Sequence, residues 1–240
     1  MSKTTWGLTG NQLKLIALIT MTIDHIGGHL LPQYRILRII GRISMPIYAF
    51  FIAEGCRYTR NKFKYFGLMA GLALVWQLVC FYYMDSLHMC ILVTFSLSIL
   101  LIYALQYMQE KGNAFSCLVF LTLLLGVYFV STKLKNYLPG FSIDYGFKGI
   151  LLPVFIALGK TKQQRLLGAA VGMCYLALGT TTQWYSLIAL IPLALYSGSR
   201  GKHSYKYLFY IYYPAHLVAI HGIGWLRANT PYLDWLKELI

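Results

Sequence analysis

Hydrophobic residues are gathered into long runs along this chain, and short polar segments separate them. A helix that crosses a bilayer needs about 20 mainly apolar residues, and nine runs approach that length. They lie near 13–31, 37–56, 64–84, 87–107, 114–131, 146–159, 165–179, 183–197 and 206–226. The sixth, seventh and eighth runs are short, so we expect these to be poorly tilted, re-entrant or partly buried in protein. The pattern predicts an all-α polytopic membrane protein with about nine transmembrane helices, and eight to ten is the expected range.

The connections between the runs are brief, and the longest is 132–145. No internal repeat or low-complexity tract occurs, so we expect one integral membrane domain over residues 1–240. The first run contains Asp24 and His25 and is followed by no small-residue cleavage motif. We therefore favour a retained first span over a cleaved signal peptide.

Composition supports the membrane interpretation. The chain has 240 residues, of which 58% are hydrophobic and 12% charged, whereas a soluble domain is about 25% charged. Disorder is excluded, because disordered chains are poor in apolar residues. The formal net charge of +14 would suggest nucleic acid in a soluble protein. In a chain this hydrophobic it instead predicts basic cytoplasmic loops, a lipid bilayer as partner and no nucleic acid.

The distribution of Lys and Arg predicts the orientation. If the N-terminus lies inside, the cytoplasmic segments hold more basic residues than the outer ones, and the loops 57–64 and 197–206 hold most of the excess. Basic residues are enriched in cytoplasmic loops. We therefore expect the N-terminus in the cytoplasm.

Three ionisable residues interrupt the first run, and each is a functional candidate because charge inside a membrane is costly. Lys14 and His25 are eleven residues apart, which corresponds to about three turns, so they share one helix face about 16 Å apart. Such a face can line a passage for a long anionic ligand. Asp24 points about 100° away from His25 and need not be its partner. A snorkelling Lys14 and a structural, hydrogen-bonded His25 remain open alternatives.

Three arginines lead into the second run at spacings of three and four. Arg35, Arg38 and Arg42 therefore lie on one helical stripe, and guanidinium groups suit phosphate or carboxylate recognition. Arg35 and Arg38 could equally be interfacial anchors. Arg42 lies one turn deeper and needs an internal partner, for which Asp24 is a plausible candidate at similar depth.

Further polar candidates lie at the end of the second run and in the last run. Glu54 and Arg57 are three residues apart, where they can pair with each other. His216 is expected near mid-depth in the last run, and Pro214 is expected to kink or loosen the helix just before it. His29 is expected to be interfacial.

Motifs of soluble enzymes are absent. The chain has no P-loop, GxGxxG, HExxH or GxSxG motif. Its five cysteines are isolated inside apolar runs, so we expect neither a disulfide framework nor a metal site. Histidine is left as the best acid or base candidate, because its unperturbed pKa lies near neutrality.

Four blocks of this sequence resemble the TraX family. They are LKLIALITMTIDHIG (13–27), RILRIIGRISMPIYAFFIAEGCRYTRNKFKY (35–65), DYGFKGILLP (144–153) and YSLIALIPLALYSGSRGKHSYKYLFYIYYPAHLV (185–218), in the family's order along nearly the whole chain. TraX proteins are integral membrane proteins associated with conjugation and named for N-terminal acetylation of pilin. They resemble a broader superfamily of transmembrane acyltransferases.

The resemblance extends to particular residues. The superfamily carries a basic residue followed, after ten residues, by a histidine in its first span, and Lys14 and His25 match that spacing. Arg35, Arg38 and Arg42 look matched to the family's arginines after this span. One position differs: family members often have Asn before the I-x-x-T-x segment of the fourth span, where this chain has Cys90.

The resemblance implies an acetyltransferase of the bacterial cytoplasmic (inner) membrane. Acetyl-CoA would be the acetyl donor, with its phosphates near Lys14 and its thioester near His25. His25 would act as general base on an amine or hydroxyl acceptor at the outer side, or less readily carry the acetyl group itself. The acceptor would be a peptide or protein N-terminus such as pilin, or a glycan.

Supporting roles follow from the same resemblance. Asp24 or Glu54 would orient or charge-balance the site. Arg38 and Arg42 would contact the cofactor, hold the acceptor or stabilise charge on the thioester oxygen. Arg35 is a further substrate contact, and His216 would serve in proton relay or substrate positioning.

Two other classes of function stay open. A proton-coupled transporter or a lipid or anion translocator accounts equally well for charges within spans. It accounts less economically for the basic-x10-His match. A structural or assembly subunit fits the many intramembrane charges less well.

Overall fold

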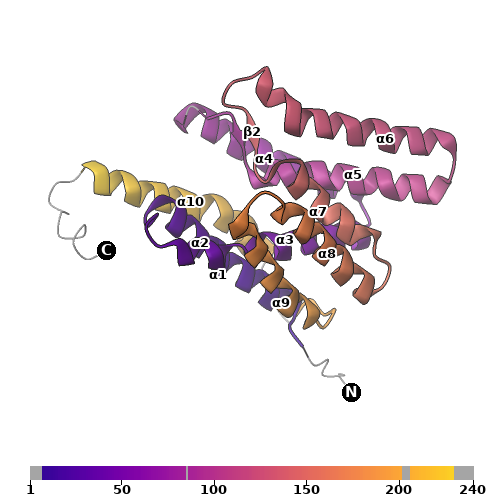
Figure 1. Cartoon of the computed structure of the whole chain (residues 1–240), viewed down its shortest axis with the longest axis horizontal. Coiled ribbons are helices and arrows are strands. Elements are labelled where there is room, and N and C mark those ends of the chain that lie inside the picture. The colour runs from indigo at the N-terminus through magenta and orange to yellow at the C-terminus, as the bar shows by residue number, and fades with distance from the viewer. Residues whose placement is uncertain (1–6, 85, 202–205, 230–240) are drawn as a thin grey trace. The chain divides into compact units, whose positions relative to one another are not determined.

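The computed structural model describes residues 7–84, 86–201 and 206–229, and these are mostly helical (Figure 1). The α-helices are α1 (Gly10–His29), α2 (Arg35–Gly41), α3 (Ser44–Tyr58), α4 (Lys62–Met84), α5 (Ile91–Lys111), α6 (Ala114–Tyr128), α7 (Gly146–Leu158), α8 (Lys162–Ala177), α9 (Leu190–Ala194) and α10 (Lys206–Asn229). The short elements are a π-helix at Phe129–Lys133, 3₁₀-helices at Leu134–Asn136 and Thr181–Ala189, and strands β1 (His88–Met89) and β2 (Ser142–Ile143). The all-α prediction is confirmed, apart from this two-residue parallel strand pair.

Each hydrophobic run is mostly helical, although the run 87–107 begins with β1. Within the described ranges, four segments are long and apolar enough to cross a membrane: Arg35–Tyr58, Lys62–Tyr82, Ile91–Lys111 and Ala114–Asn136. The number of nine spans therefore stays a prediction. The short eighth run is not a regular α-helix, because residues Thr181–Ala189 form a 3₁₀-helix.

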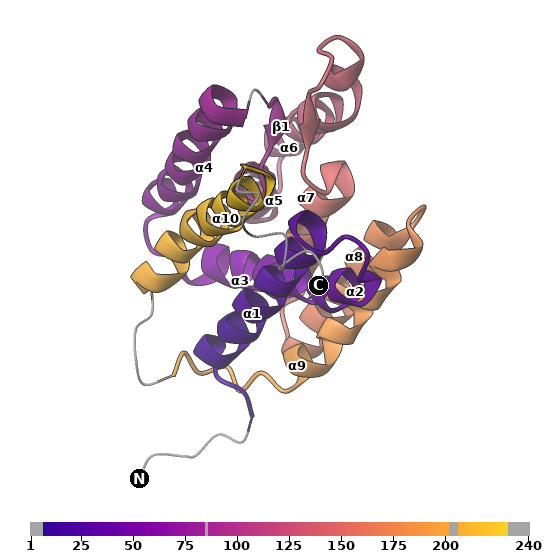
Figure 2. The ribbon, with the colours of Figure 1, turned by 90° about the vertical axis from the view of Figure 1, so that its left-hand side faces the viewer.

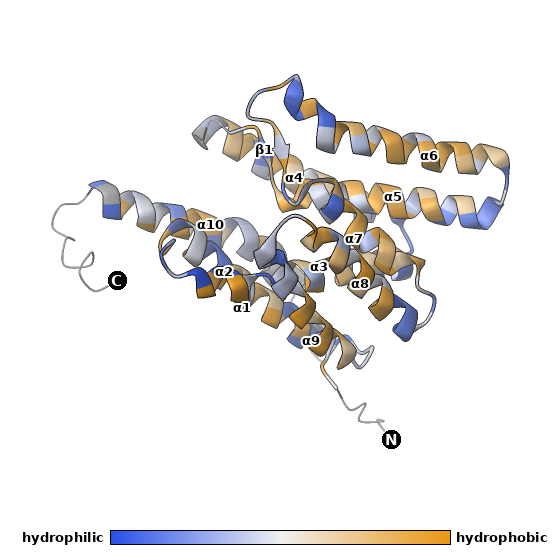
Figure 3. Cartoon of the chain, in the orientation of Figure 1, coloured by the Kyte–Doolittle hydropathy of each residue, from blue (hydrophilic) through white to orange (hydrophobic). Residues whose placement is uncertain are grey.

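Two of these segments expose apolar side chains around most of their circumference. In Lys62–Tyr82 and in Ala114–Asn136, only 11% of the apolar window is buried. Large side chains such as Leu74, Val75 and Leu125 are more than 60% exposed, and Figure 3 shows apolar residues along both helices. A helix that is apolar all round belongs in lipid or in a protein core. Their exposed surfaces are those of a membrane protein.

The orientation of the chain is predicted by its two basic loops. Of the two basic loops that predict it, 57–64 is described, whereas residues 202–205 of the second lie outside the described residues. The cytoplasmic N-terminus and the inner-membrane location remain predictions.

Helix ends follow from local sequence. Thr9 and Thr161 each begin a helix with a capping box, in which a glutamine three residues later bonds back to the cap. Gly112 ends α5 in the left-handed conformation with φ of 61°, and Asn113 caps the start of α6. Glycine adopts positive φ without steric cost, so two residues suffice to reverse the chain between these helices.

The chain divides into two compact units. Unit 1 comprises residues 1–48 and 179–240, and unit 2 comprises residues 49–178, within the described ranges. The division falls inside α3. The single membrane domain expected from the sequence stays a prediction.

In unit 1, α1 packs against α2 and α10, and the Thr181–Ala189 3₁₀-helix packs against α2. Figure 2 shows α10 alongside α1. Gly27 permits the close approach of α1 and α2, because a Cβ there would lie 2.6 Å from the Cβ of Leu37. The start of α1 is fixed by a parallel bridge between Leu8 and Tyr196.

In unit 2, α5 contacts α4, α6 and α7, and α8 packs on α7. Buried hydroxyls link the central helix to its neighbour, because Ser98 Oγ donates to the Ile150 carbonyl at 2.8 Å. Gly168 and Gly172 face α7, where a Cβ would meet the Phe155 carbonyl and the Leu152 side chain. These two glycines therefore allow α7 and α8 to pack closely.

Candidate functional site

Two adjacent residues of α1 face different neighbours in unit 1. Asp24 contacts α2, whereas His25 contacts α10. Successive residues of an α-helix point about 100° apart, so one helix carries an ionic cluster on one side and a histidine pair on the other.

The ionic cluster consists of Asp24, Arg38 and Arg42. Arg42 Nη2 donates to both carboxylate oxygens of Asp24, at 2.5 and 2.7 Å, and Arg38 Nη1 donates to Asp24 Oδ2 at 2.9 Å. Both carboxylate oxygens therefore accept from guanidinium groups. The expected partnership of Asp24 and Arg42 is confirmed. Asp24 pairs with two arginines, and among the described residues its side chain makes no hydrogen bond to His25.

The two arginines differ in exposure. The side chain of Arg42 is 11% exposed and that of Arg38 is 40% exposed. Arg42 Nε also donates to the Arg38 carbonyl at 3.1 Å. Within the described residues, Arg38 Nε and Nη2 have no hydrogen-bond partner. Arg38 therefore retains the donors that an anionic ligand can use.

Gln183 extends the cluster. Its Oε1 accepts from Arg42 Nη1 at 3.3 Å, while its buried Nε2 and the buried hydroxyl of Ser186 have no partner in the described structure. Residues three apart eclipse on a 3₁₀-helix, which places both side chains on one inward face. The sequence analysis did not identify these two residues, because it treated the run as an ordinary apolar span. The spacing of three between two polar residues at its start could have indicated a shared face.

The histidine pair joins α1 to α10. His25 Nδ1 lies 2.7 Å from His216 Nε2, and His216 Nδ1 lies 2.8 Å from the Tyr212 carbonyl oxygen. A second contact supports the same interface, because Thr22 Oγ1 and the Tyr212 hydroxyl are 2.8 Å apart. His216 is 6% exposed, so α10 delivers it into the interior of unit 1.

The carbonyl of Tyr212 assigns the proton positions. A carbonyl oxygen only accepts, so His216 Nδ1 carries a hydrogen, and in neutral His216 the Nε2 is then an acceptor. His25 Nδ1 must therefore be the donor, and in neutral His25 the proton-accepting atom is Nε2. That atom has no hydrogen-bond partner within the described residues. His25 is thus held in the tautomer that a general base requires.

Two more histidines lie along the same helices. The ring centroids of His25 and His29 are 6.2 Å apart, and those of His29 and His221 are 4.6 Å apart in an edge-on arrangement. His29 is exposed. The four rings lead from the buried His216 to the surface of unit 1.

The remaining predicted residues are not all brought to this site. Lys14 lies on α1, at the spacing from His25 that the sequence gives. Arg35 is exposed and has no polar partner among the residues described. Glu54 belongs to unit 2.

The suggested pairing of Glu54 with Arg57 is wrong. Glu54 pairs with Arg165 of α8, and both side chains are largely buried, at 9% and 14% exposed. Arg57 instead donates from Nη1 to the Gly159 carbonyl at 3.3 Å. The carbonyl end of a helix attracts cations, and Arg57 reaches the end of α7.

Within the described residues, no group of three or more His, Cys, Asp or Glu is arranged to hold a metal ion. The five cysteines are free.

Comparison with known proteins gives two matches over most of the chain. A family model described as TraX protein matches residues 9–224. The "Probable fimbrial assembly protein FimC, serogroup H1" of Dichelobacter nodosus is 25% identical over 238 residues, which covers 87% of this chain and 93% of that protein. The "Uncharacterized protein RP591" of Rickettsia prowazekii (strain Madrid E) is 62% identical over 39 residues, or 16% of each chain. No solved structure matches.

Proposed function

Since this chain belongs to the TraX family, we propose that it is a membrane acetyltransferase. It moves an acetyl group from cytoplasmic acetyl-CoA to an amine or hydroxyl at the outer side of the bacterial inner membrane. Its N-terminus lies in the cytoplasm, and its donor and acceptor approach from opposite sides.

The observation that carries this proposal is the Nε2 of His25, which has no hydrogen-bond partner among the described residues. Its lone pair is available because the Tyr212 carbonyl fixes the tautomer of His216, which in turn fixes that of His25. A general base with a pre-set tautomer contributes typically 10²- to 10⁴-fold to the rate. The paired imidazoles therefore supply a proton acceptor although no carboxylate of the described residues is hydrogen-bonded to His25.

The chemistry proceeds by direct transfer. The acceptor nitrogen or oxygen attacks the thioester carbonyl carbon while its proton moves to His25 Nε2. The tetrahedral intermediate collapses as the carbon–sulfur bond breaks, and the departing CoA sulfur takes the proton from His25. The acetyl group ends on the acceptor, CoA leaves as the thiol, and the histidine pair returns to its starting state.

The arginine cluster supports the charge that develops in this step. Arg38 keeps N–H donors beyond those bound to Asp24, and such donors stabilise a thioester oxygen as it becomes negative. Asp24 holds Arg38 and Arg42 in position. Lys14, on the same helix as His25, meets the phosphates of the donor.

The relative from Dichelobacter nodosus supports a protein acceptor. That relative is named as a probable fimbrial assembly protein, so we infer that the acceptor is an N-terminal amine of a surface-fibre subunit. A glycan hydroxyl is the alternative acceptor.

A proton-coupled transporter is the second candidate, and the row of four histidine rings favours it. A transporter would move its solute without forming an acetyl product. The two functions therefore predict different products from the same purified protein.

The test is transfer of labelled acetyl groups from acetyl-CoA by protein purified into nanodiscs, with pilin-type peptides and sugars as acceptors. His25→Ala should lower the transfer rate at least about 100-fold. His88→Ala is the matched control, because His88 is an exposed histidine of unit 2 that bonds Ser142, and it should transfer normally. Near wild-type transfer by His25→Ala would refute the assigned base, and solute uptake with no acetyl product would favour the transporter.

A further inference from the structure

A second candidate site lies entirely within unit 2. A cavity of about 140 Å³ is formed where α3, α5 and α7 end and α8 begins. Pockets that enclose a whole small molecule usually measure about 300 Å³ or more. This cavity is therefore large enough for one terminal group of a ligand rather than for a complete cofactor.

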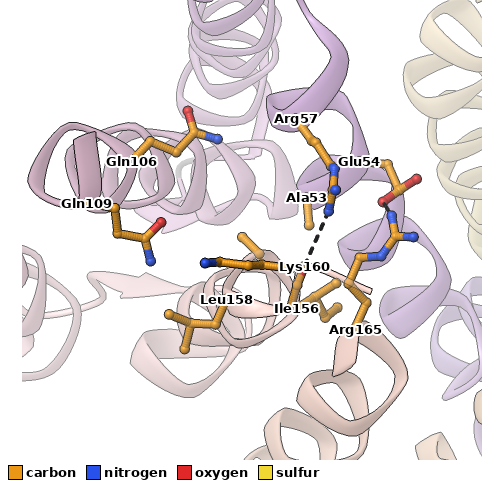
Figure 4. A pocket seen from close by; sticks show the side chains of 11 residues that line it. Ala53, Glu54, Arg57, Gln106, Gln109, Ile156, Leu158, Lys160 and Arg165 are labelled. Atoms are coloured by element: carbon orange, nitrogen blue, oxygen red, sulfur yellow. Dashed lines mark hydrogen bonds and ion pairs between the residues drawn. The ribbon is translucent and has the colours of Figure 1, made fainter. Parts of the chain in front are cut away.

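Three charged residues of the lining already have partners within the fold. Glu54 pairs with Arg165, and Arg57 donates from Nη1 to the Gly159 carbonyl (Figure 4). Helix C-termini disfavour anions, and the guanidinium of Arg57 covers one carbonyl at the end of α7. At the α7 end, the cavity wall therefore carries the positive charge of Arg57 beside the Gly159 carbonyl.

The other polar side chains of the lining have no such partner in the part of the chain that is described. Lys160, Gln106 and Gln109 border the cavity, and their side chains have no hydrogen-bond or ion-pair partner in the part of the chain that is described. Figure 4 shows the Lys160 side chain reaching toward the α5 side, where both glutamines lie. An ammonium and two amides therefore converge on the space with unused donors.

The surroundings of the cavity are strongly basic. The three connections at this end of unit 2 and the helix ends that flank them carry Arg57, Arg60, Lys62, Lys64, Lys111, Lys160, Lys162 and Arg165, against Glu54 and Glu110. Lys62 and Glu110 lie 3.7 Å apart, which ties the start of α4 to the end of α5. An excess of basic charge at one end raises the local concentration of anionic ligands.

We propose that this cavity binds a phosphate group, with Lys160 as the principal charge and Gln106, Gln109 and Arg57 as hydrogen-bond donors. Lysine binds phosphate as a point charge, and the surrounding donors can reach the several oxygens of one phosphate. The ligand class is a phosphomonoester, whose terminal phosphate offers three oxygens to these donors, and the 3′-phosphate of CoA is a suitable probe of that class. The headgroup of an anionic phospholipid offers the same chemistry.

The experiment compares binding of CoA and 3′-dephospho-CoA by calorimetry, without turnover. The variant is Lys160→Gln. The matched control is Lys135→Gln, an exposed lysine of the Leu134–Asn136 3₁₀-helix in the same unit. Wild-type protein and the control should bind CoA about tenfold more tightly than 3′-dephospho-CoA, and Lys160→Gln should bind the two equally. Melting curves establish that each variant is folded.

A lipid arm separates the two sources of phosphate. If Lys160→Gln keeps the wild-type preference for CoA but loses phosphatidylglycerol adducts in native mass spectrometry, the assignment to a phosphomonoester is overturned and the phosphate site belongs to lipid. If neither ligand responds to Lys160→Gln, the phosphate site itself is overturned. His25→Ala should retain the preference for CoA, so failure of acetyl transfer and failure of this site give different results.

Discussion

Gly41 holds the ionic cluster together by having no side chain. A Cβ at this position would lie 2.2 Å from the Cβ of Asp24 and 2.3 Å from its Oδ1, distances that side chains do not adopt. Gly41→Ala should therefore push Asp24 away from Arg38 and Arg42. Breaking a buried ion pair costs about 3–5 kcal/mol, and replacing glycine by alanine in a helix returns at most about 1 kcal/mol. We expect a net loss of about 3 kcal/mol.

The assay is reversible unfolding of the purified protein in mixed micelles of mild detergent and sodium dodecyl sulfate. Gly71→Ala in α4 is the matched control, because a Cβ there meets nothing within 4 Å. It should leave the free energy of unfolding unchanged or raise it by up to about 1 kcal/mol. If Gly41→Ala proves as stable as Gly71→Ala, Asp24 is not held against α2 as described.

Three further predictions concern other parts of the structure. His216→Asn should lower kcat for acetyl transfer about 10- to 100-fold with KM for acetyl-CoA unchanged, because it frees the tautomer of His25; an unchanged kcat would contradict the positioning role. Ser186→Ala should be neutral or stabilise the fold by up to about 1 kcal/mol in thermal denaturation, since it removes a buried hydroxyl that has no partner in the described structure, and marked destabilisation would contradict the absence of that hydrogen bond. Glu54→Gln and Arg165→Gln should each destabilise by about 3 kcal/mol, and the double variant should lose less than the sum; strict additivity would argue against the pair.

The sequence was most informative about charged residues inside apolar runs. An unpaired charge there is costly, and few residues of opposite charge lie at the same depth. Arg42 could not remain unpaired inside an apolar run, and Asp24 was the acid at similar depth, so their contact was predictable and is found. The adjacency of Asp24 and His25 likewise predicted that they would face different neighbours. Both inferences use only helix geometry and the cost of buried charge.

Other contacts depend on pairings that sequence spacing does not encode. Glu54 has an arginine three residues away, yet it pairs with Arg165, 111 residues along the chain. Local spacing made the nearer pair plausible, but the end of α7 attracts Arg57 to a carbonyl. The tautomer of His25 depends on the main-chain oxygen of Tyr212, and no pattern of side chains reports such a contact.

The sequence did not predict that Gln183 and Ser186 share a buried face, and the reason is the period of the helix. Amphipathic patterns are normally read with a period of 3.6 residues or of two. The segment Thr181–Ala189 has a period of three, so its buried polar positions do not stand out from its apolar ones.

The arrangement of α1 between two polar neighbours also limits how that helix can move. Asp24 is clamped to α2 by two arginines, and His25 is tethered to α10 by its ring nitrogen. A rotation of α1 about its own axis would move both side chains at once. It would lengthen the ion pairs of Asp24 and break the contact between His25 and His216. The helix is therefore held against rotation at two points. A ligand that drew Arg38 away from Asp24 would weaken one of these restraints, and the position of the His25 imidazole would change.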